Sequence, residues 1–259
     1  MKVSHEVPLS LLEKSRNFND YDYCLVHFLP QYERYKLFYE ESVKLGRHVL
    51  LDNSIFELGS SYNSEEFASW IKKLKPTEYI IPDVLDNGFE TIKNLHLWLD
   101  RYGDLPGKKI GVVQGQSYED AKDCYLEIVD KVDKVAFSFD SIFYEDFFYD
   151  DGILSKYERW MFGRIFTLNK LAQDNIIDWK KPHHLLGCSL PQEFLYYRGL
   201  EFIETIDTSN PIVHGLRGIK YEPWGLLDKV GSMAEFVEIE DFDLELIEYN
   251  IGVFRSFIT

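Results

Sequence analysis

The chain has 259 residues, 45% of them hydrophobic, and a formal net charge of −16 at pH 7. This charge argues against tight nonspecific binding to nucleic acid, because proteins that hold the phosphate backbone usually present a basic face. The sequence has no run of 18 apolar residues, which argues against a membrane-spanning protein, and its N-terminus lacks the features of a signal peptide. We therefore expect a soluble, cytoplasmic protein that forms one domain over residues 1–259.

Short apolar runs alternate along the chain with amphipathic stretches, which is typical of repeated strand and helix units around a parallel sheet. We predict strands at residues 24–29, 48–52, 78–82, 109–114, 134–139, 184–188 and 202–207, with a weaker one at 212–216. Apolar residues at three- and four-residue spacing predict helices at 31–45, 64–74, 88–102, 118–129, 155–173 and 192–198. A final strand and helix are expected within 235–259. This order favours a single (β/α)8 TIM-type barrel.

The segment 140–151, rich in Phe, Tyr and Asp, fits neither the helical nor the strand period. We predict an enlarged loop there, after the fifth strand, which makes the barrel irregular and is placed to cover a site.

The three cysteines, Cys24, Cys124 and Cys188, lie far apart in the sequence. This spacing fits neither a disulfide framework nor a zinc site, whose ligands come in closely spaced pairs. His183 and His184 are adjacent, and neighbouring residues of a strand point to opposite faces. We therefore expect a protein without a bound metal.

Polar residues follow several of the predicted strands. They are Asp52 and Asn53, Asp83, Gln114 and Asp207. A single Asp at such a place is often a helix cap or a turn residue. In a parallel barrel, however, the carboxyl ends of all strands meet at one mouth, so these groups are expected to form a common site.

Two carboxyl groups in different environments suit chemistry at a glycosidic bond. One attacks or stabilises the anomeric carbon, and the other transfers a proton to the departing group. A departing nucleobase also needs polar groups at its edge and an apolar face to stack on. Phe56 and Leu186 are candidates for that face, although both are also plausible core residues.

Five segments, in this order along the chain, resemble motifs of the tRNA-guanine transglycosylases and their DNA-acting relatives. They are Asp-Asn-Ser-Ile-Phe-Glu at 52–57, Ile-Pro-Asp at 81–83, Gly-Val-Val-Gln-Gly at 111–115, His-Leu-Leu-Gly at 184–187 and Asp-Thr-Ser-Asn-Pro at 207–211. The family has a (β/α)8 barrel and exchanges guanine in a nucleic acid for a free 7-deazaguanine base. The resemblance implies that this reaction requires no metal or organic cofactor.

The resemblance implies a role for each matching residue. Asp207 would be the covalent nucleophile and Asp52 the general acid and base. Asp83 and Gln114 would read the base edge, and Phe56 would stack on the base opposite Leu186 and Gly187. The candidate substrate-binding residues are thus Asn53, Phe56, Asp83, Gln114, Gly115, Ser138, Leu186 and Gly187.

The sequence also departs from the family pattern. It has no counterpart of the zinc subdomain with three Cys and one His, on which docking of tRNA depends, so the resemblance favours DNA over tRNA as the polymer, in a bacterial or phage-infected cell. The Gly-Gly-Leu motif is replaced by Phe-Ser-Phe-Asp at 137–140, and an Arg of the family is Val213 here. We expect phosphate contacts from two basic clusters, namely Lys180 and Lys181, and Arg217 and Lys220.

The residues leave other functions open. If water instead of a base reacted with the covalent glycosyl-enzyme, the protein would be a nucleosidase or a base-releasing glycosylase. A free nucleoside as substrate would be compatible with the net negative charge of the protein. A non-catalytic protein that binds a modified base, or serves another protein as a partner subunit, is a third reading. Whether the chain forms a homodimer is also open.

Overall fold

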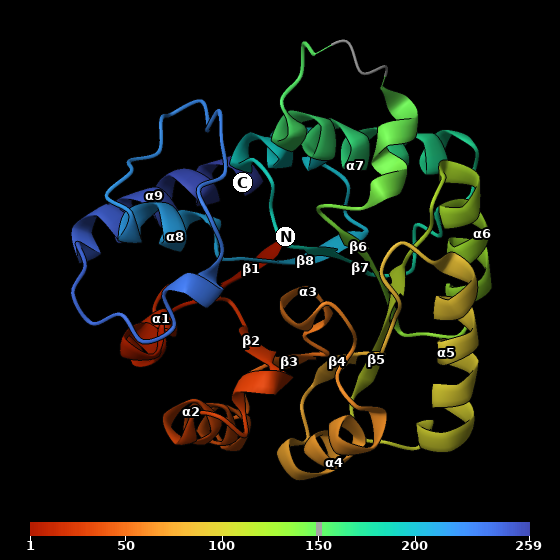
Figure 1. Ribbon diagram of the computed structural model, residues 1–259, viewed down its shortest axis with the longest axis horizontal. Coiled ribbons are helices and arrows are strands. Elements are labelled where there is room, and N and C mark those ends of the chain that lie inside the picture. Colours follow the sequence, from red (N-terminus) through yellow and green to blue (C-terminus); the bar gives the residue numbers. More distant parts are fainter. Residues whose placement is uncertain (149–151) are drawn as a thin grey trace.

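The computed structural model describes residues 1–148 and 152–259. Within them, eight strands form one parallel sheet in the order β1-β8-β7-β6-β5-β4-β3-β2. The strands are β1 (Lys2–His5), β2 (Asp22–Leu25), β3 (Val49–Asp52), β4 (Glu78–Ile80), β5 (Lys108–Val113), β6 (Lys134–Ser138), β7 (His183–Leu186) and β8 (Ile203–Thr208). Helices lie outside the strands (Figure 1), so the predicted (β/α)8 TIM-type barrel is confirmed.

The α-helices are α1 (Leu12–Ser15), α2 (Glu33–Lys44), α3 (Ile55–Leu58), α4 (Ser64–Leu74), α5 (Gly88–Tyr102), α6 (Tyr118–Ile128), α7 (Lys156–Gln173), α8 (Asn210–Leu216) and α9 (Leu244–Ile258). Helices α1 to α7 lie between strands, and α8 and α9 follow the last strand. Side chains of Asn63, Asn87, Ser117 and Ser155 accept hydrogen bonds from N–H groups in the first turns of α4 to α7, which fixes where these helices begin. No helix in the described part of the chain is long and apolar enough to cross a lipid bilayer.

Between β1 and β2 there is no ladder of backbone hydrogen bonds, and the barrel closes through two side chains just before β2 and one backbone hydrogen bond. The Val3 N–H donates to Asp20 Oδ2 over 2.8 Å, and the Asp20 N–H donates to the Val3 carbonyl over 2.9 Å. Asn19 bonds both the N–H and the carbonyl of His5, at 2.7 and 2.9 Å. These contacts hold the first strand beside the second, and they position the residue that follows His5 at the mouth.

The weak strand predicted at 212–216 is wrong, because these residues belong to α8. Residues Asn210–Gly215 of this short helix are all buried, and Ile212 and Val213 belong to a small second core that includes Ile247 and Ile251. A helix that is buried on every side shows no helical period, so its apolar run was read as a strand. The true eighth strand is β1, which was missed because Lys2–His5 contains one apolar residue, Val3.

Three other boundaries also differ from the prediction. The first predicted strand, 24–29, is strand only to Leu25, and Val26–Phe28 forms a 3-10 helix. Residues Pro191–Tyr197 form a 3-10 helix in place of the α-helix predicted at 192–198. The strand expected after residue 235 is absent from 235–243, although the final helix is present as α9.

Of the segment expected to be an enlarged loop, residues 140–148 contain the 3-10 helix Ile142–Phe147. Phe143 and Tyr144 are buried, and the Tyr144 hydroxyl donates to the Ser138 carbonyl. Residues 149–151 lie outside the described residues.

Candidate active site at the barrel mouth

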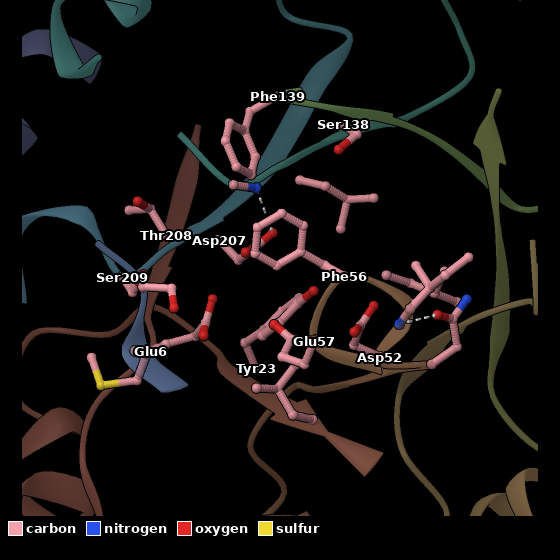
Figure 2. A pocket seen from close by; sticks show the side chains of 18 of the residues that line it. Glu6, Tyr23, Asp52, Phe56, Glu57, Ser138, Phe139, Asp207, Thr208 and Ser209 are labelled. Atoms are coloured by element: carbon pink, nitrogen blue, oxygen red, sulfur yellow. Dashed lines mark hydrogen bonds between the residues drawn. The ribbon is translucent and has the colours of Figure 1, made fainter. Parts of the chain in front are cut away.

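A cavity of about 240 Å³ lies at the carboxyl ends of the strands (Figure 2). The sequence-predicted residues that line it are Asp52, Asn53, Phe56, Asp83, Gln114, Ser138, Leu186, Gly187 and Asp207. Each follows or ends a strand, or lies on α3 directly after β3, as the barrel geometry requires. The structure therefore brings nearly all of the predicted substrate-site residues together.

Gly115 is the exception. It does not line the cavity, and it packs against α6, where an added Cβ would lie 2.6 Å from the Ala121 backbone nitrogen. The structure thus gives Gly115 a packing role, which corrects its assignment as a base-binding residue.

Asp207 is buried in β8 and is held through one carboxylate oxygen. Its Oδ1 lies 3.0 Å from His184 Nε2 and accepts a 3.3 Å hydrogen bond from the Gly187 N–H. No described residue bonds its Oδ2. An Asp held in this way keeps one oxygen available for a ligand in the cavity.

Asp52 ends β3, and its Oδ2 accepts a 2.8 Å hydrogen bond from the Ser54 N–H. Ser54 adopts the left-handed conformation, with φ of 59°, in the turn that begins α3. Burial, reinforced by the carboxylates of Glu57, Asp207 and Asp83, raises the pKa of Asp52 well above its usual range. Asp52 is therefore expected to carry a proton that it can donate.

Asp83 is held by two amide side chains. Asn53 Nδ2 donates to its Oδ1 over 2.8 Å, and Gln114 Nε2 donates to its Oδ2 over 2.7 Å. Gln114 Oε1 in turn accepts a 3.0 Å bond from the Asp86 N–H, which fixes the orientation of the amide. Burial raises the pKa of Asp83, and the two amide hydrogen bonds oppose this effect. The group presents oriented polar atoms to the cavity.

Two aromatic rings form a wall of the cavity. The centroids of Phe56 and Phe139 lie 5.5 Å apart with the rings tilted by 58°. Phe56 is 49% exposed, so its face has area to offer to a ligand. Gly187 has a φ of 65°, and a Cβ there would overlap the Phe139 ring, so both conformation and space require glycine. Leu186 lines the same wall, whereas the Ser138 hydroxyl bonds Asp140 over 2.7 Å.

A buried ion pair supports this wall from behind. Arg164 of α7 bonds both carboxylate oxygens of Glu193, over 2.6 and 3.0 Å, and both side chains are fully buried. The same guanidinium donates to the carbonyls of Phe137, Leu186 and Gly187 over 3.3, 3.0 and 3.0 Å. Arg164 thus ties the ends of β6 and β7 together.

Sequence reasoning missed several residues that line the cavity, among them Glu6, Tyr23, Glu57 and Lys229 (Figure 2 shows the first three). Glu6 directly follows β1, the strand that was not predicted. Glu57 lies inside the 52–57 motif, which could have identified it. Lys229 lies in an irregular segment after α8, where no sequence signal marks it.

The added carboxyl groups change the electrostatics of the site. Burial, together with the carboxylates of Asp207 and Asp52, raises the pKa of Glu6 to about 8. Burial, together with carboxylates led by that of Glu6, raises the pKa of Glu57 to about 8. Lys229 is the only Lys or Arg among the described residues that line the cavity. Its ammonium donates to the Cys188 carbonyl over 3.0 Å and lies 3.8 Å from the Phe139 ring centroid.

The structure separates the two predicted basic clusters. Lys180 and Lys181 precede β7 and so lie at the end of the barrel opposite the cavity, which removes them as phosphate contacts at the mouth. Arg217 is paired with Glu235 over 2.6 Å, next to Ala234 of the cavity lining. The Lys220 ammonium lies 4.3 Å from the Tyr249 ring centroid, on α9.

Within residues 1–148 and 152–259, no group of three or more His, Cys, Asp and Glu side chains is arranged to hold a metal ion. The three cysteines are free and buried.

Residues 140–148 contribute no side chain to the cavity lining, so the predicted cover of the site is not formed by this part of the segment.

No protein-family model matches the chain, and a search of curated proteins found no match.

Proposed function

We propose that the chain is a base-exchange transglycosylase, which replaces guanine in a nucleic acid, DNA in preference to tRNA, with a 7-deazaguanine base. The observation that carries the proposal is the pairing of Asp207, with a free oxygen, and Asp52, with a raised pKa, at one cavity. Two carboxyl groups in different environments, one free to attack and one able to transfer a proton, are what two successive displacements at a glycosidic carbon need.

In the first displacement, Asp207 Oδ2 attacks the anomeric carbon and forms a glycosyl ester. The bond from that carbon to guanine breaks, and the proton of Asp52 passes to the departing base. In the second, Asp52 takes a proton from the incoming base, whose nitrogen attacks the same carbon and displaces Asp207. The two steps return both side chains to their starting states.

The remaining lining residues support a planar base as the ligand. Asp83 accepts hydrogen bonds, and Gln114 can donate and accept, so together they complement the N–H and carbonyl groups at the edge of guanine. The exposed face of Phe56 supplies a surface for stacking.

The choice of DNA rests on the sequence resemblance, in which the missing zinc subdomain removes the platform for tRNA. The mouth offers few cations for phosphate, since Lys229 lines the cavity and Arg217 is already paired. Binding of the polymer should therefore be weak, with a shallow dependence on salt.

Hydrolysis is the second candidate function, and Glu6 and Glu57 are the observation that favours it. Above a pH of about 8 these groups add carboxylates beside Asp207, and a carboxylate there can activate a water molecule against the glycosyl ester. The product would be a free base and a sugar instead of an exchanged base.

Radiolabelled guanine separates these functions. The protein is incubated with labelled guanine and, in separate reactions, duplex DNA, tRNA or guanosine, with Asp207→Asn as the inactive control. Label entering duplex DNA supports the proposal. Label entering tRNA would support base exchange but would show that tRNA, and not DNA, is the polymer. Free guanine released from guanosine, without label uptake, establishes hydrolysis. Guanine binding with neither reaction makes the chain a base-binding protein.

A further inference from the structure

A continuous line of buried polar contacts crosses the barrel interior and ends on Asp207. At the amino ends of the strands, the Lys134 ammonium donates to Glu78 over 2.7 Å and to Thr205 Oγ1 over 3.3 Å. Thr205 Oγ1 lies 2.9 Å from His184 Nδ1, and His184 Nε2 lies 3.0 Å from Asp207 Oδ1. All five side chains are at most 3% exposed.

This line is unusual for its place in the fold, because the interior of such a barrel is ordinarily filled with branched apolar side chains. Burying polar and charged groups is costly unless each finds a partner. A Leu at position 184 would fill the space without that cost. Packing alone therefore does not explain why a histidine with polar partners occupies this interior position.

The direction of each hydrogen bond follows from what the groups can donate. An ammonium has three donors and no acceptor, and Lys134 uses all three, the third on Glu204 over 2.8 Å. Thr205 Oγ1 thus accepts from Lys134. Among the described residues, its hydroxyl hydrogen has one remaining partner, His184 Nδ1. The arrangement that satisfies every group leaves Nδ1 without a proton and places the proton on Nε2.

We propose that His184, held as the Nε2–H tautomer by Thr205 and Lys134, is the positioning residue that presents the free oxygen of Asp207 to the substrate. The Nε2–H and the Gly187 N–H both point at Oδ1, so the carboxylate cannot rotate without losing two donors. This inference rests on the proposed role of Asp207 as the nucleophile. His184 itself does not touch the substrate.

The neighbouring His183 provides a matched control. It lies on the same strand but faces outward, where its ring bonds the Tyr125 hydroxyl over 3.1 Å and the Lys181 carbonyl over 2.8 Å. His183→Gln therefore makes the same change one residue away, without touching Asp207.

The first test reads the tautomer directly and does not depend on any activity. In full-length protein with ¹⁵N-labelled histidine, the NMR signals of His184 are assigned as those missing from His184→Gln. We expect a protonated Nε2 and an unprotonated Nδ1, and we expect Thr205→Val to change that signature. A protonated Nδ1 in the wild-type protein would overturn the inference.

The second test measures base exchange in His184→Gln, His184→Leu and His183→Gln. Misplacing a reacting group by about 1 Å can cost about 100-fold in rate. We expect His184→Leu to lose about 100-fold in kcat with little change in KM, and His184→Gln, whose amide keeps an N–H donor, to recover most of the loss. Wild-type kcat in a folded His184→Leu variant would refute the positioning role. Failure of the wild-type protein to exchange base would instead refute the proposed function, and the NMR result would still decide the tautomer.

Discussion

Replacing Arg164 by Met should destabilise the protein strongly and loosen the wall of the cavity. The change leaves the fully buried carboxylate of Glu193 without its partner, which typically costs about 3–5 kcal/mol. The carbonyls of Phe137, Leu186 and Gly187 also lose a donor. For a chain of this size, 1 kcal/mol shifts Tm by about 2–4 °C, so the melting temperature should fall by about 6–20 °C.

Urea denaturation measures this cost, and two further variants isolate its cause. The double variant Arg164→Met, Glu193→Met removes both charges and should be more stable than Arg164→Met alone. Lys170→Met, on the same helix, breaks an exposed ion pair with Asp174 and should cost at most about 1 kcal/mol. If Arg164→Met cost no more than Lys170→Met, the reasoning about the buried pair would be refuted.

Three other predictions concern the site. The contribution of Glu6 and Glu57 to stability should be fully present below a pH of about 4.5 and should be lost as the pH rises to about 8, because the folded protein retains protons on them that the unfolded chain releases. In urea midpoints measured across pH, Glu57→Gln should therefore lose less stability than the wild-type protein over this range, and an unchanged slope would contradict the prediction. Hypoxanthine, which lacks the exocyclic amine of guanine, should bind more weakly by about 1–3 kcal/mol in calorimetry, and equal affinity would remove Asp83 from base recognition. Gly187→Ala should destabilise more than Gly218→Ala, since both have positive φ but only the first also overlaps Phe139; equal urea midpoints would argue against the close packing.

Where a strand was recognised, the sequence predicted correctly which polar residues converge at the mouth of the barrel. Asp52, Asp83, Gln114 and Asp207 follow or end strands with clear apolar runs, and parallel strands place such residues at one mouth. To predict this convergence, it was enough to recognise the strands that carry these residues and to expect them to be parallel. The exact ends of the strands were not needed.

The errors arose where tertiary contacts, and not the local sequence pattern, determine the structure. β1 is stabilised by pairing with β8 and by the side chains of Asn19 and Asp20, so its own four residues carry little signal, and Glu6 was missed with it. The apolar residues of α8 reflect burial on all sides and not a strand.

The most direct test of the central claim is capture of the covalent intermediate. Guanine-containing duplex DNA is incubated with the protein, the mixture is denatured, and the cross-linked peptide is identified by mass spectrometry. The account predicts a glycosyl adduct on Asp207 that forms in the wild-type protein and not in Asp207→Asn, which should still bind guanine. Base exchange at near the original rate in Asp207→Asn, or an adduct on another side chain, would contradict it.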